Sequence, residues 1–80
     1  MNLEIITPDK KVFAGQATAV TFPGADGQFQ VLNQHAPLVS TIGKGSLVVE
    51  SAGGKNTYQI NGGVVEVLND NVLVLAEAIA

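Results

Sequence analysis

The stretch of sequence that decides the fold is VVEVLNDNVLVLA, residues 64–76. It contains two short runs of Val and Leu, residues 64–68 and 72–76, on either side of the polar triplet Asn69-Asp70-Asn71. Aliphatic and β-branched runs that flank a short segment rich in Asn and Asp are typical of an antiparallel hairpin. The stretch therefore predicts two paired strands joined by a three-residue loop.

The register of this hairpin decides which side chains reach a core. With a three-residue loop, Leu68 faces Val72, and one side of the hairpin becomes fully apolar. That core side consists of Val65, Val67, Leu73 and Leu75. The other side consists of Val64, Leu68, Val72 and Val74 around Glu66, and a shift by one residue still leaves it mainly apolar.

An apolar outer face needs an explanation, because a half-exposed antiparallel strand usually carries polar residues on its outer side. Two explanations are open. In the first, barrel closure or the alanine-rich tail of residues 76–80 covers the face. In the second, the face is a docking patch for another subunit.

Short strand patterns recur along the rest of the chain. They cover residues 2–6, 11–13, 17–22, 28–32, 38–42, 46–50 and 56–60. Turn residues separate these strands at Thr7-Pro8-Asp9-Lys10, at Gly43-Lys44-Gly45 and in the loop of residues 51–55. Only residues 76–80 lean toward a helix, and so short a segment is not stable alone. The sequence thus predicts one all-β domain, residues 1–80, a flattened β-sandwich or barrel of about eight to ten short antiparallel strands.

Composition excludes several classes of function. The chain has a net charge of −3, four lysines, no arginine and few aromatic residues, so it lacks the basic face or stacking platform that nucleic acid binding needs. Without cysteine it has neither disulfides nor thiolate metal ligands. The N-terminus has no signal-peptide pattern, and no apolar run approaches the ~20 residues that span a bilayer. We expect a soluble, cytoplasmic protein.

Residue types that carry chemistry are present but isolated. His35 is the only histidine, and no HxxxH or CxxC spacing accompanies it. Ser40 and the other serines lie outside any GxSxG pattern. Gly53-Gly54-Lys55 lacks the remaining residues of a phosphate-binding loop. We therefore expect no catalytic residue, no metal and no cofactor.

The least generic segment is PGADGQFQVLNQHAPL, residues 23–38. Gly24 and Gly27 bracket an acidic turn, a short strand follows, and a second turn contains His35 and Pro37. Ordered surface turns on a rigid scaffold usually serve contact or chemistry. Because the chemistry is missing, contact is the better interpretation.

These features, taken in order, resemble the epsilon subunit of bacterial and chloroplast rotary ATP synthases, which is the delta subunit in mitochondria. The matching positions are Thr7-Pro8, Phe13, Gly15, Val20, Pro23-Gly24, Gly27, Phe29, His35-Ala36-Pro37-Leu38, the glycine turn of residues 43–45, Gly62-Gly63, Glu66-Val67 and residues 71–76. The chain departs from the family at Gln30, where Gly is usual, and at Asn33-Gln34, where Pro-Gly is usual. Because Asn tolerates positive φ better than most residues, we expect a similar turn there.

The resemblance implies a non-catalytic central-stalk subunit of a proton-translocating ATP synthase. Such a subunit bridges the gamma subunit and the c ring, couples proton-driven rotation to ATP synthesis, and lies on the cytoplasmic side of the bacterial inner membrane. The resemblance places the c-ring contact at Gly24, Ala25, Asp26, Gly27 and Gln28. It places the gamma contact at Thr7, His35, Ala36, Pro37, Leu38 and Ser40. For His35 the alternative is a partly buried histidine that pins the Pro37 turn.

Family members usually carry a further C-terminal pair of helices, and this sequence stops at Ala80, where that pair would begin. We therefore expect the sandwich domain without the helical hairpin. We also expect neither inhibition by helices nor nucleotide binding through this subunit.

Two other classes of protein remain as alternatives. Carrier domains of the biotinyl or lipoyl type are also small acidic β-sandwiches, and they carry a modified lysine at a hairpin tip, for which Lys55 is the candidate. A free-standing β scaffold without a partner is the second alternative.

Overall fold

The computed structural model describes residues 1–24 and 26–79, which form seven strands and, over these residues, no helix. The strands are β1 (Asn2–Ile6), β2 (Lys11–Gln16), β3 (Ala19–Gly24), β4 (Gly27–Leu32), β5 (Leu38–Ser51), β6 (Gly54–Leu68) and β7 (Asn71–Ala76). They form one mixed sheet in the order β2-β1-β7-β6-β5-β3-β4. Only β1 and β7 pair in parallel. The predicted all-β class is confirmed.

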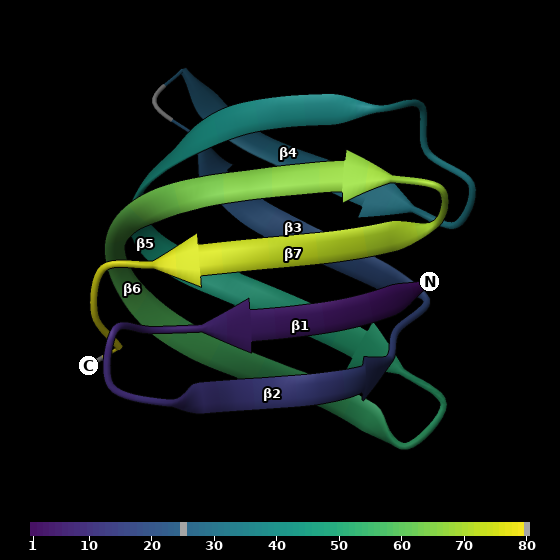
Figure 1. The fold of residues 1–80 in the computed structure, drawn as a ribbon, viewed down its shortest axis with the longest axis horizontal. Coiled ribbons are helices and arrows are strands. Elements are labelled where there is room, and N and C mark those ends of the chain that lie inside the picture. Colours follow the sequence, from purple (N-terminus) through teal and green to yellow (C-terminus); the bar gives the residue numbers. More distant parts are fainter. Residues whose placement is uncertain (25, 80) are drawn as a thin grey trace.

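The sheet folds over itself into two layers because β5 and β6 are long and bend through both of them (Figure 1). One layer holds β1, β2 and β7 together with one half of the β5–β6 pair. The other layer holds β3 and β4 together with the remaining half. In the described part of the chain β2 and β4 are the outer strands, so the sandwich is not closed into a barrel.

At two places where the sequence pattern separates one strand from the next, the structure has a bend inside a single strand. The glycine turn of residues 43–45 lies within β5, and Gly62-Gly63 lies within β6, so seven strands form rather than a larger number of short ones. Gly62 and Gly63 have φ angles of 123° and 154°, and a Cβ at Gly63 would collide with the carbonyl oxygen of Leu75. Glycine marks a sharp bend in a strand as well as a turn, and the sequence pattern alone does not separate the two.

The hairpin between β6 and β7 differs from the expected register by one residue. Leu68 pairs with Asn71, which leaves Asn69 and Asp70 as a two-residue turn. Their φ angles of 51° and 62° are those of a type I′ turn, whose twist matches that of the flanking strands. Because side chains alternate along a strand, Val72 and Val74 enter the core, and the expected core residues Leu73 and Leu75 do not.

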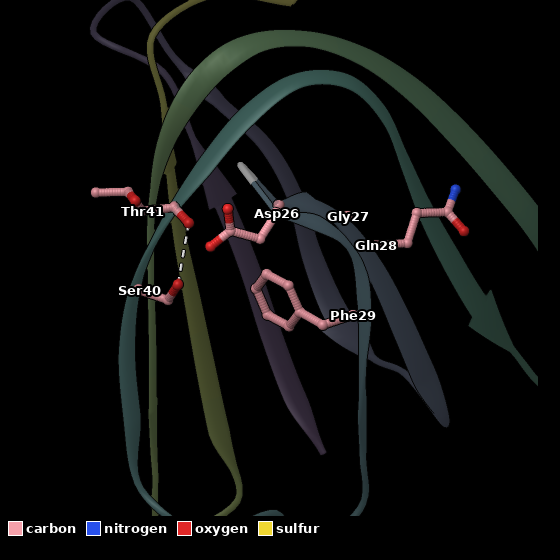
Figure 2. A pocket seen from close by; sticks show the side chains of 7 residues that line it. Asp26, Gly27, Gln28, Phe29, Ser40 and Thr41 are labelled. Atoms are coloured by element: carbon pink, nitrogen blue, oxygen red, sulfur yellow. Dashed lines mark hydrogen bonds between the residues drawn. The ribbon is translucent and has the colours of Figure 1, made fainter.

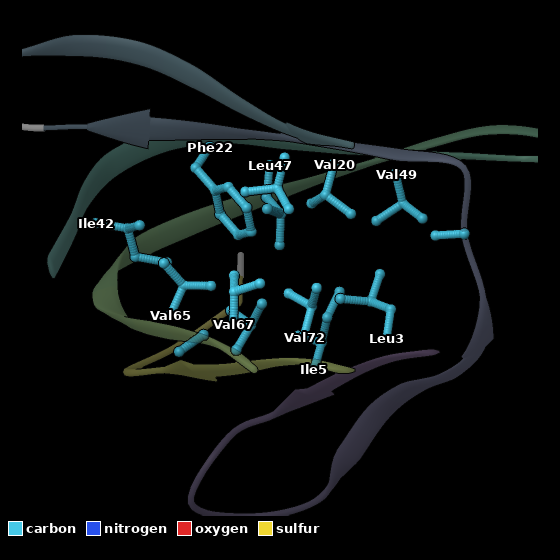
Figure 3. Packing of buried hydrophobic residues seen from close by; sticks show 14 of the residues in the cluster. Leu3, Ile5, Val20, Phe22, Ile42, Leu47, Val49, Val65, Val67 and Val72 are labelled. Carbon is cyan, nitrogen blue, oxygen red and sulfur yellow. The ribbon is translucent and has the colours of Figure 1, made fainter. Parts of the chain in front are cut away.

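The core between the layers is almost entirely aliphatic. Figure 3 shows side chains of β3 and β5 in one layer facing those of β1, β6 and β7 in the other. The largest fully buried side chains are Phe22, Leu3, Ile5, Leu47, Ile60, Val20, Val31, Val49, Val65 and Val74. Among the described residues no polar or charged residue is buried, so apolar packing holds the layers together.

The end of the chain follows β6 as an extended segment. Glu77 N donates to the Gly62 carbonyl oxygen at 3.0 Å, and Ile79 forms a β-bridge with Ile60. The expected helical tendency of residues 76–80 is therefore not seen up to Ile79, and Ala80 lies outside the described residues. A single helical turn would add little stability, whereas the extended segment lets Ile79 pack against the core.

A pair of leucine substitutions tests this core assignment. Leu47 is fully buried and Leu75 is 43% exposed. We expect Leu47→Ala to lower the free energy of unfolding by about 2–5 kcal/mol, because it leaves a cavity. We expect Leu75→Ala to lower it by less than about 1 kcal/mol. Urea denaturation followed by circular dichroism measures both losses, and equal losses would contradict the register described above.

Candidate interaction surfaces

Most of the predicted contact residues lie at two opposite ends of the sandwich, and Ser40 lies between them. Because β1 and β7 run in parallel, Asn2 lies beside Asn71 at one end and Ile6 beside Leu75 at the other. The Asn2 end also holds the β6–β7 turn and the loop after β4, and we name it the Asp70 end (Figure 1). The Ile6 end also holds the turn after β3 and the glycine bends of β5 and β6, and we name it the glycine end.

The turn between β3 and β4 carries the predicted c-ring contact. Gly24 pairs with Gly27, and a Cβ at Gly24 would collide with the Gly27 carbonyl oxygen, so the tight turn requires glycine there. Asp26 and Gln28 are exposed, and Gly27 has a φ of 117°. Ala25, the fifth predicted residue, lies outside the described residues.

An open depression of about 320 Å³ lies between this turn and β5. Figure 2 shows Asp26 pointing toward Ser40 and Thr41, with the Phe29 ring beside them. Ser40 Oγ donates a hydrogen bond to the Thr41 carbonyl oxygen at 3.0 Å. The depression therefore places Ser40, a predicted gamma contact, beside the predicted c-ring contact.

The loop after β4 contains the second turn of the segment of residues 23–38, the one with His35 and Pro37. Gln34, and not Asn33, adopts the positive φ, at 61°. For a residue other than glycine, this left-handed conformation costs about 1–2 kcal/mol of conformational free energy. Gln34 N donates to Asp70 Oδ1 at 3.0 Å, and Asn33 Oδ1 accepts from the Met1 amino group at 2.6 Å. The expectation that Asn33 supplies the positive φ is wrong, because the residue in this conformation is Gln34.

His35 is exposed, so the alternative of a partly buried histidine is wrong. Its Nδ1 lies 2.7 Å from the Ala36 carbonyl oxygen, which accepts a hydrogen bond when Nδ1 carries the proton. Ala36 and Pro37 are also exposed, whereas Leu38 is half-buried against the core. Residues 35–37 therefore form an accessible tip that Leu38 attaches to the sandwich.

The structure does not bring all the predicted gamma contacts together. Thr7 directly follows Ile6 at the glycine end, where it lines a shallow pocket with Leu75 and Glu77. His35 lies at the Asp70 end. Ser40 lies on β5 between the two, so any surface that includes all three must extend along the sandwich.

An exposed apolar face extends along the sandwich on the side of β5 that Val39 and Thr41 face. Ser40, which pairs with the buried Val65, faces the other side. In one cross-strand row Val39, Glu66, Leu73 and Glu4 are neighbours, and in the next row Thr41, Val64, Leu75 and Ile6. Three of the large side chains are strongly exposed: Val39 at 73%, Leu68 at 58% and Leu75 at 43%. We name the apolar set the outer strip; it consists of Ile6, Val39, Val64, Leu68, Leu73 and Leu75. The tail up to Ile79 leaves these three side chains uncovered.

The strip therefore matches the sequence prediction in character but not in membership. The one-residue shift of the hairpin replaces Val72 and Val74 with Leu73 and Leu75 on the outer side. Sequence reasoning missed Val39, since the signal that would place it on this face is its pairing with Glu66 across β5 and β6. Glu66 is exposed within the strip, and Glu4 at its edge forms an ion pair with Lys11 at 3.0 Å.

Lys55 does not occupy the position that a carrier domain requires. The tip of the β5–β6 hairpin consists of Ala52 and Gly53, because Ser51 pairs with Gly54. Lys55 is already in β6, opposite Glu50. The hairpin is confirmed where the sequence predicts it, but its lysine lies beside the tip.

Two further kinds of functional feature concern metal binding and the membrane. The residues that the structure describes contain no group of three His, Cys, Asp or Glu side chains that could hold a metal ion. Nor do they include a helix with the length and apolar character needed to cross a membrane.

Known proteins match this chain over its whole length. Residues 1–80 match the family described as the ATP synthase delta/epsilon chain, beta-sandwich domain. The ATP synthase epsilon chain of Desulforamulus reducens is 41% identical over 76 residues, which cover 95% of this chain and 58% of that protein. The epsilon chain of Chlorobium limicola is 37% identical over 80 residues, 99% of this chain and 91% of that protein. The chain thus spans less than two thirds of the first relative and most of the second.

Solved structures agree with this match. A chain in the mitochondrial ATP synthase of Euglena gracilis, solved with OSCP, F1 and c-ring, has a TM-score of 0.90 and 27% identity, and the match covers 98% of this chain and 51% of that one. A chain from the central stalk and c-ring of the Tetrahymena thermophila enzyme has a TM-score of 0.86 at 13% identity, and it shows the shared fold alone. From its first to its last residue, the chain belongs to the delta/epsilon family of ATP synthase subunits and corresponds to the β-sandwich domain of that family.

Proposed function

We propose that this domain is a non-catalytic part of the central stalk of a proton-translocating ATP synthase, where it bridges the gamma subunit and the c ring. In this role it couples proton-driven rotation to ATP synthesis, on the cytoplasmic side of the bacterial inner membrane. The observation that carries the proposal is the match of residues 1–80 to the delta/epsilon β-sandwich family. The similar Euglena chain, which comes from an assembly with F1 and c-ring, supports it.

A bridging subunit must transmit torque without deforming, and the packing of this domain suits that task. Within residues 1–24 and 26–79, seventeen hydrophobic residues are buried, in a body of 26 × 25 × 19 Å. Close-packed interiors have low compressibility and transmit strain. The two long strands β5 and β6 also join both layers covalently, so a load on one layer reaches the other through continuous backbone.

For the c-ring contact we propose the turn at the glycine end, Gly24 to Gln28, with Ala25 included from the sequence. The exposed Asp26 carboxylate can pair with a basic side chain of a c-subunit loop, and the exposed Gln28 amide can hydrogen-bond beside it. One exposed ion pair contributes about 0.2–1 kcal/mol. A rotating ring therefore needs several such contacts at once.

For the gamma subunit we propose a contact along the outer strip. This face reaches Thr7 at the glycine end and approaches His35, Ala36, Pro37 and Leu38 at the Asp70 end. An exposed apolar face of this kind marks a protein–protein contact more often than a free surface. Ser40 faces the depression beside Asp26 and not the outer strip, so a gamma contact there would lie at the border between the two proposed contacts.

The c-ring contact predicts a loss of assembly without a loss of folding. The double variant Asp26→Ala with Gln28→Ala removes the charge and the amide from the turn. We expect less c ring to co-purify with the solubilised synthase, because an ion pair of about 0.2–1 kcal/mol and a hydrogen bond of about 0.5–1.5 kcal/mol are lost. The thermal midpoint of the isolated domain should stay unchanged, because both side chains are exposed.

The matched control is Glu50→Ala with Gln59→Ala, which removes the same two groups away from this turn. It should co-purify the c ring as the parent does. Undiminished c-ring recovery and coupled ATP synthesis in the Asp26 and Gln28 variant would show that the ring binds elsewhere.

The gamma contact predicts that one exposed leucine matters more than another. Leu68 in the outer strip is 58% exposed, and Leu32 on β4, in the other layer, is 52% exposed. If gamma covers Leu68, Leu68→Ser should weaken gamma binding about five- to thirtyfold, corresponding to one or two kcal/mol of lost apolar burial. Leu32→Ser should have little effect. Titration calorimetry with the gamma subunit of the same synthase measures both, and equal affinities of the two variants would refute the strip as the gamma contact.

A further inference from the structure

One side chain at the Asp70 end joins three segments that are distant in sequence. Asp70 Oδ1 accepts a hydrogen bond from Gln34 N at 3.0 Å, and Asp70 Oδ2 lies 3.7 Å from the Met1 amino group. The carbonyl oxygen of Asp70 accepts from Asn2 N at 3.0 Å. The β6–β7 turn, the start of β1 and the loop before His35 are thus tied to one residue.

The hydrogen bond between Asp70 and the loop is made at Gln34, the residue of the loop with an unfavourable backbone conformation. Gln34 has a φ of 61°, a region that glycine enters freely and other residues rarely do. A residue in this region is retained when the surroundings over-determine its conformation. Here the Asp70 carboxylate accepts a hydrogen bond from Gln34 N–H. The neighbouring Asn33 side chain accepts one from the Met1 amino group. The loop therefore relies on outside partners for a shape that glycine would adopt unaided.

We propose that Asp70 is a positioning residue for the His35 contact. Its carboxylate holds Gln34 in the left-handed conformation and so fixes the direction in which residues 35–37 leave β4. The inference rests on the proposed function, because it assumes that this tip meets the gamma subunit. Asp70 itself does not need to touch gamma.

A purely structural role for Asp70, in the turn that it occupies, is the competing explanation. Asn69 and Asp70 form a type I′ turn, and both have positive φ. Asn followed by Gly is the preferred pair for such a turn, so Asp70→Gly keeps or improves the turn while it removes the carboxylate. This variant separates the two roles, because a turn residue would tolerate it and a positioning residue would not.

The experiment compares four variants of the full chain with the parent: Asp70→Gly, Asp70→Asn, Gln34→Gly, and Asp70→Gly combined with Gln34→Gly. NMR hydrogen exchange reports on the Gln34 amide, circular dichroism reports the thermal midpoint, and calorimetry reports affinity for the gamma subunit. For Asp70→Gly we expect an equal or higher thermal midpoint, because glycine suits the turn. Hydrogen exchange at the Gln34 amide should be about five- to tenfold faster, because one hydrogen bond is lost. Affinity for the gamma subunit should fall by a similar factor. Asp70→Asn keeps an acceptor oxygen and should behave as the parent.

Rescue by glycine decides between positioning and any direct contact of Asp70. Gly at position 34 adopts the required conformation without help, so adding Gln34→Gly to Asp70→Gly should restore gamma affinity. The proposal is overturned if Asp70→Gly leaves Gln34 exchange unchanged, or if the glycine at position 34 restores no affinity.

The proposed gamma contact has its own test, which keeps the two failures apart. If His35→Ala binds gamma as tightly as the parent, then the contact at this tip is wrong, and the affinity results no longer bear on Asp70. The exchange rate at Gln34 still decides whether Asp70 holds the loop, since that measurement needs no partner.

Discussion

The pairing of β5 with β6 is the constraint on which the rest of the structure depends. It runs from Leu38 beside Val67 to Ser51 beside Gly54, and it bends so that each half belongs to a different layer. The bend is possible because glycines occupy it, and at Gly63 any larger residue would meet the Leu75 carbonyl. The Gly43 bend in turn lies against the backbone of Pro23 and Gly24, which sets the turn that carries Asp26 at the glycine end.

Local patterns predict the kind of structure here but not its register. The alternation of Val and Leu in residues 64–76 correctly predicts a hairpin with an apolar outer face. The exact faces depend on whether Asn71 belongs to the loop or to β7, and only the positive φ of both Asn69 and Asp70 settles this. Likewise, glycine in the Gly43 and Gly62 regions looks the same in a turn and in a bent strand, so the number of strands could not be counted from the sequence.

For the candidate contacts too, the sequence predicts the local turns but not how distant segments are brought together. The turns at Gly24 and at His35 are recognisable from Gly, Pro and Asp spacing alone, whereas the exposure of His35 is seen only in the structure. Their separation at opposite ends follows from β4, the strand that connects them. The position of Thr7 at the glycine end depends instead on the parallel pairing of β1 with β7, which joins segments from the two ends of the chain and leaves no local signal. The bond between Asp70 and Gln34 is a contact of the same kind, and it accounts for a glutamine where glycine would be the simpler choice.

The proposed contacts assign one end of the domain to the c ring and one long face to the gamma subunit. A polar turn with an exposed acidic side chain suits a contact with hydrated polar loops. An apolar strip with a single carboxylate near its centre suits a durable contact. Under the proposed function, separate surfaces of different chemistry would let one small domain hold two partners at once.

Cross-linking in the assembled synthase tests this two-surface account most directly. The chain contains no cysteine, so Asp26→Cys or Leu68→Cys places a single thiol in this subunit, one at the glycine end and one in the outer strip. With a short thiol-specific photo-cross-linker, the account predicts that position 26 joins a c subunit and position 68 joins gamma. Cross-links from both positions to the same subunit, or from position 68 to the c ring, would contradict it.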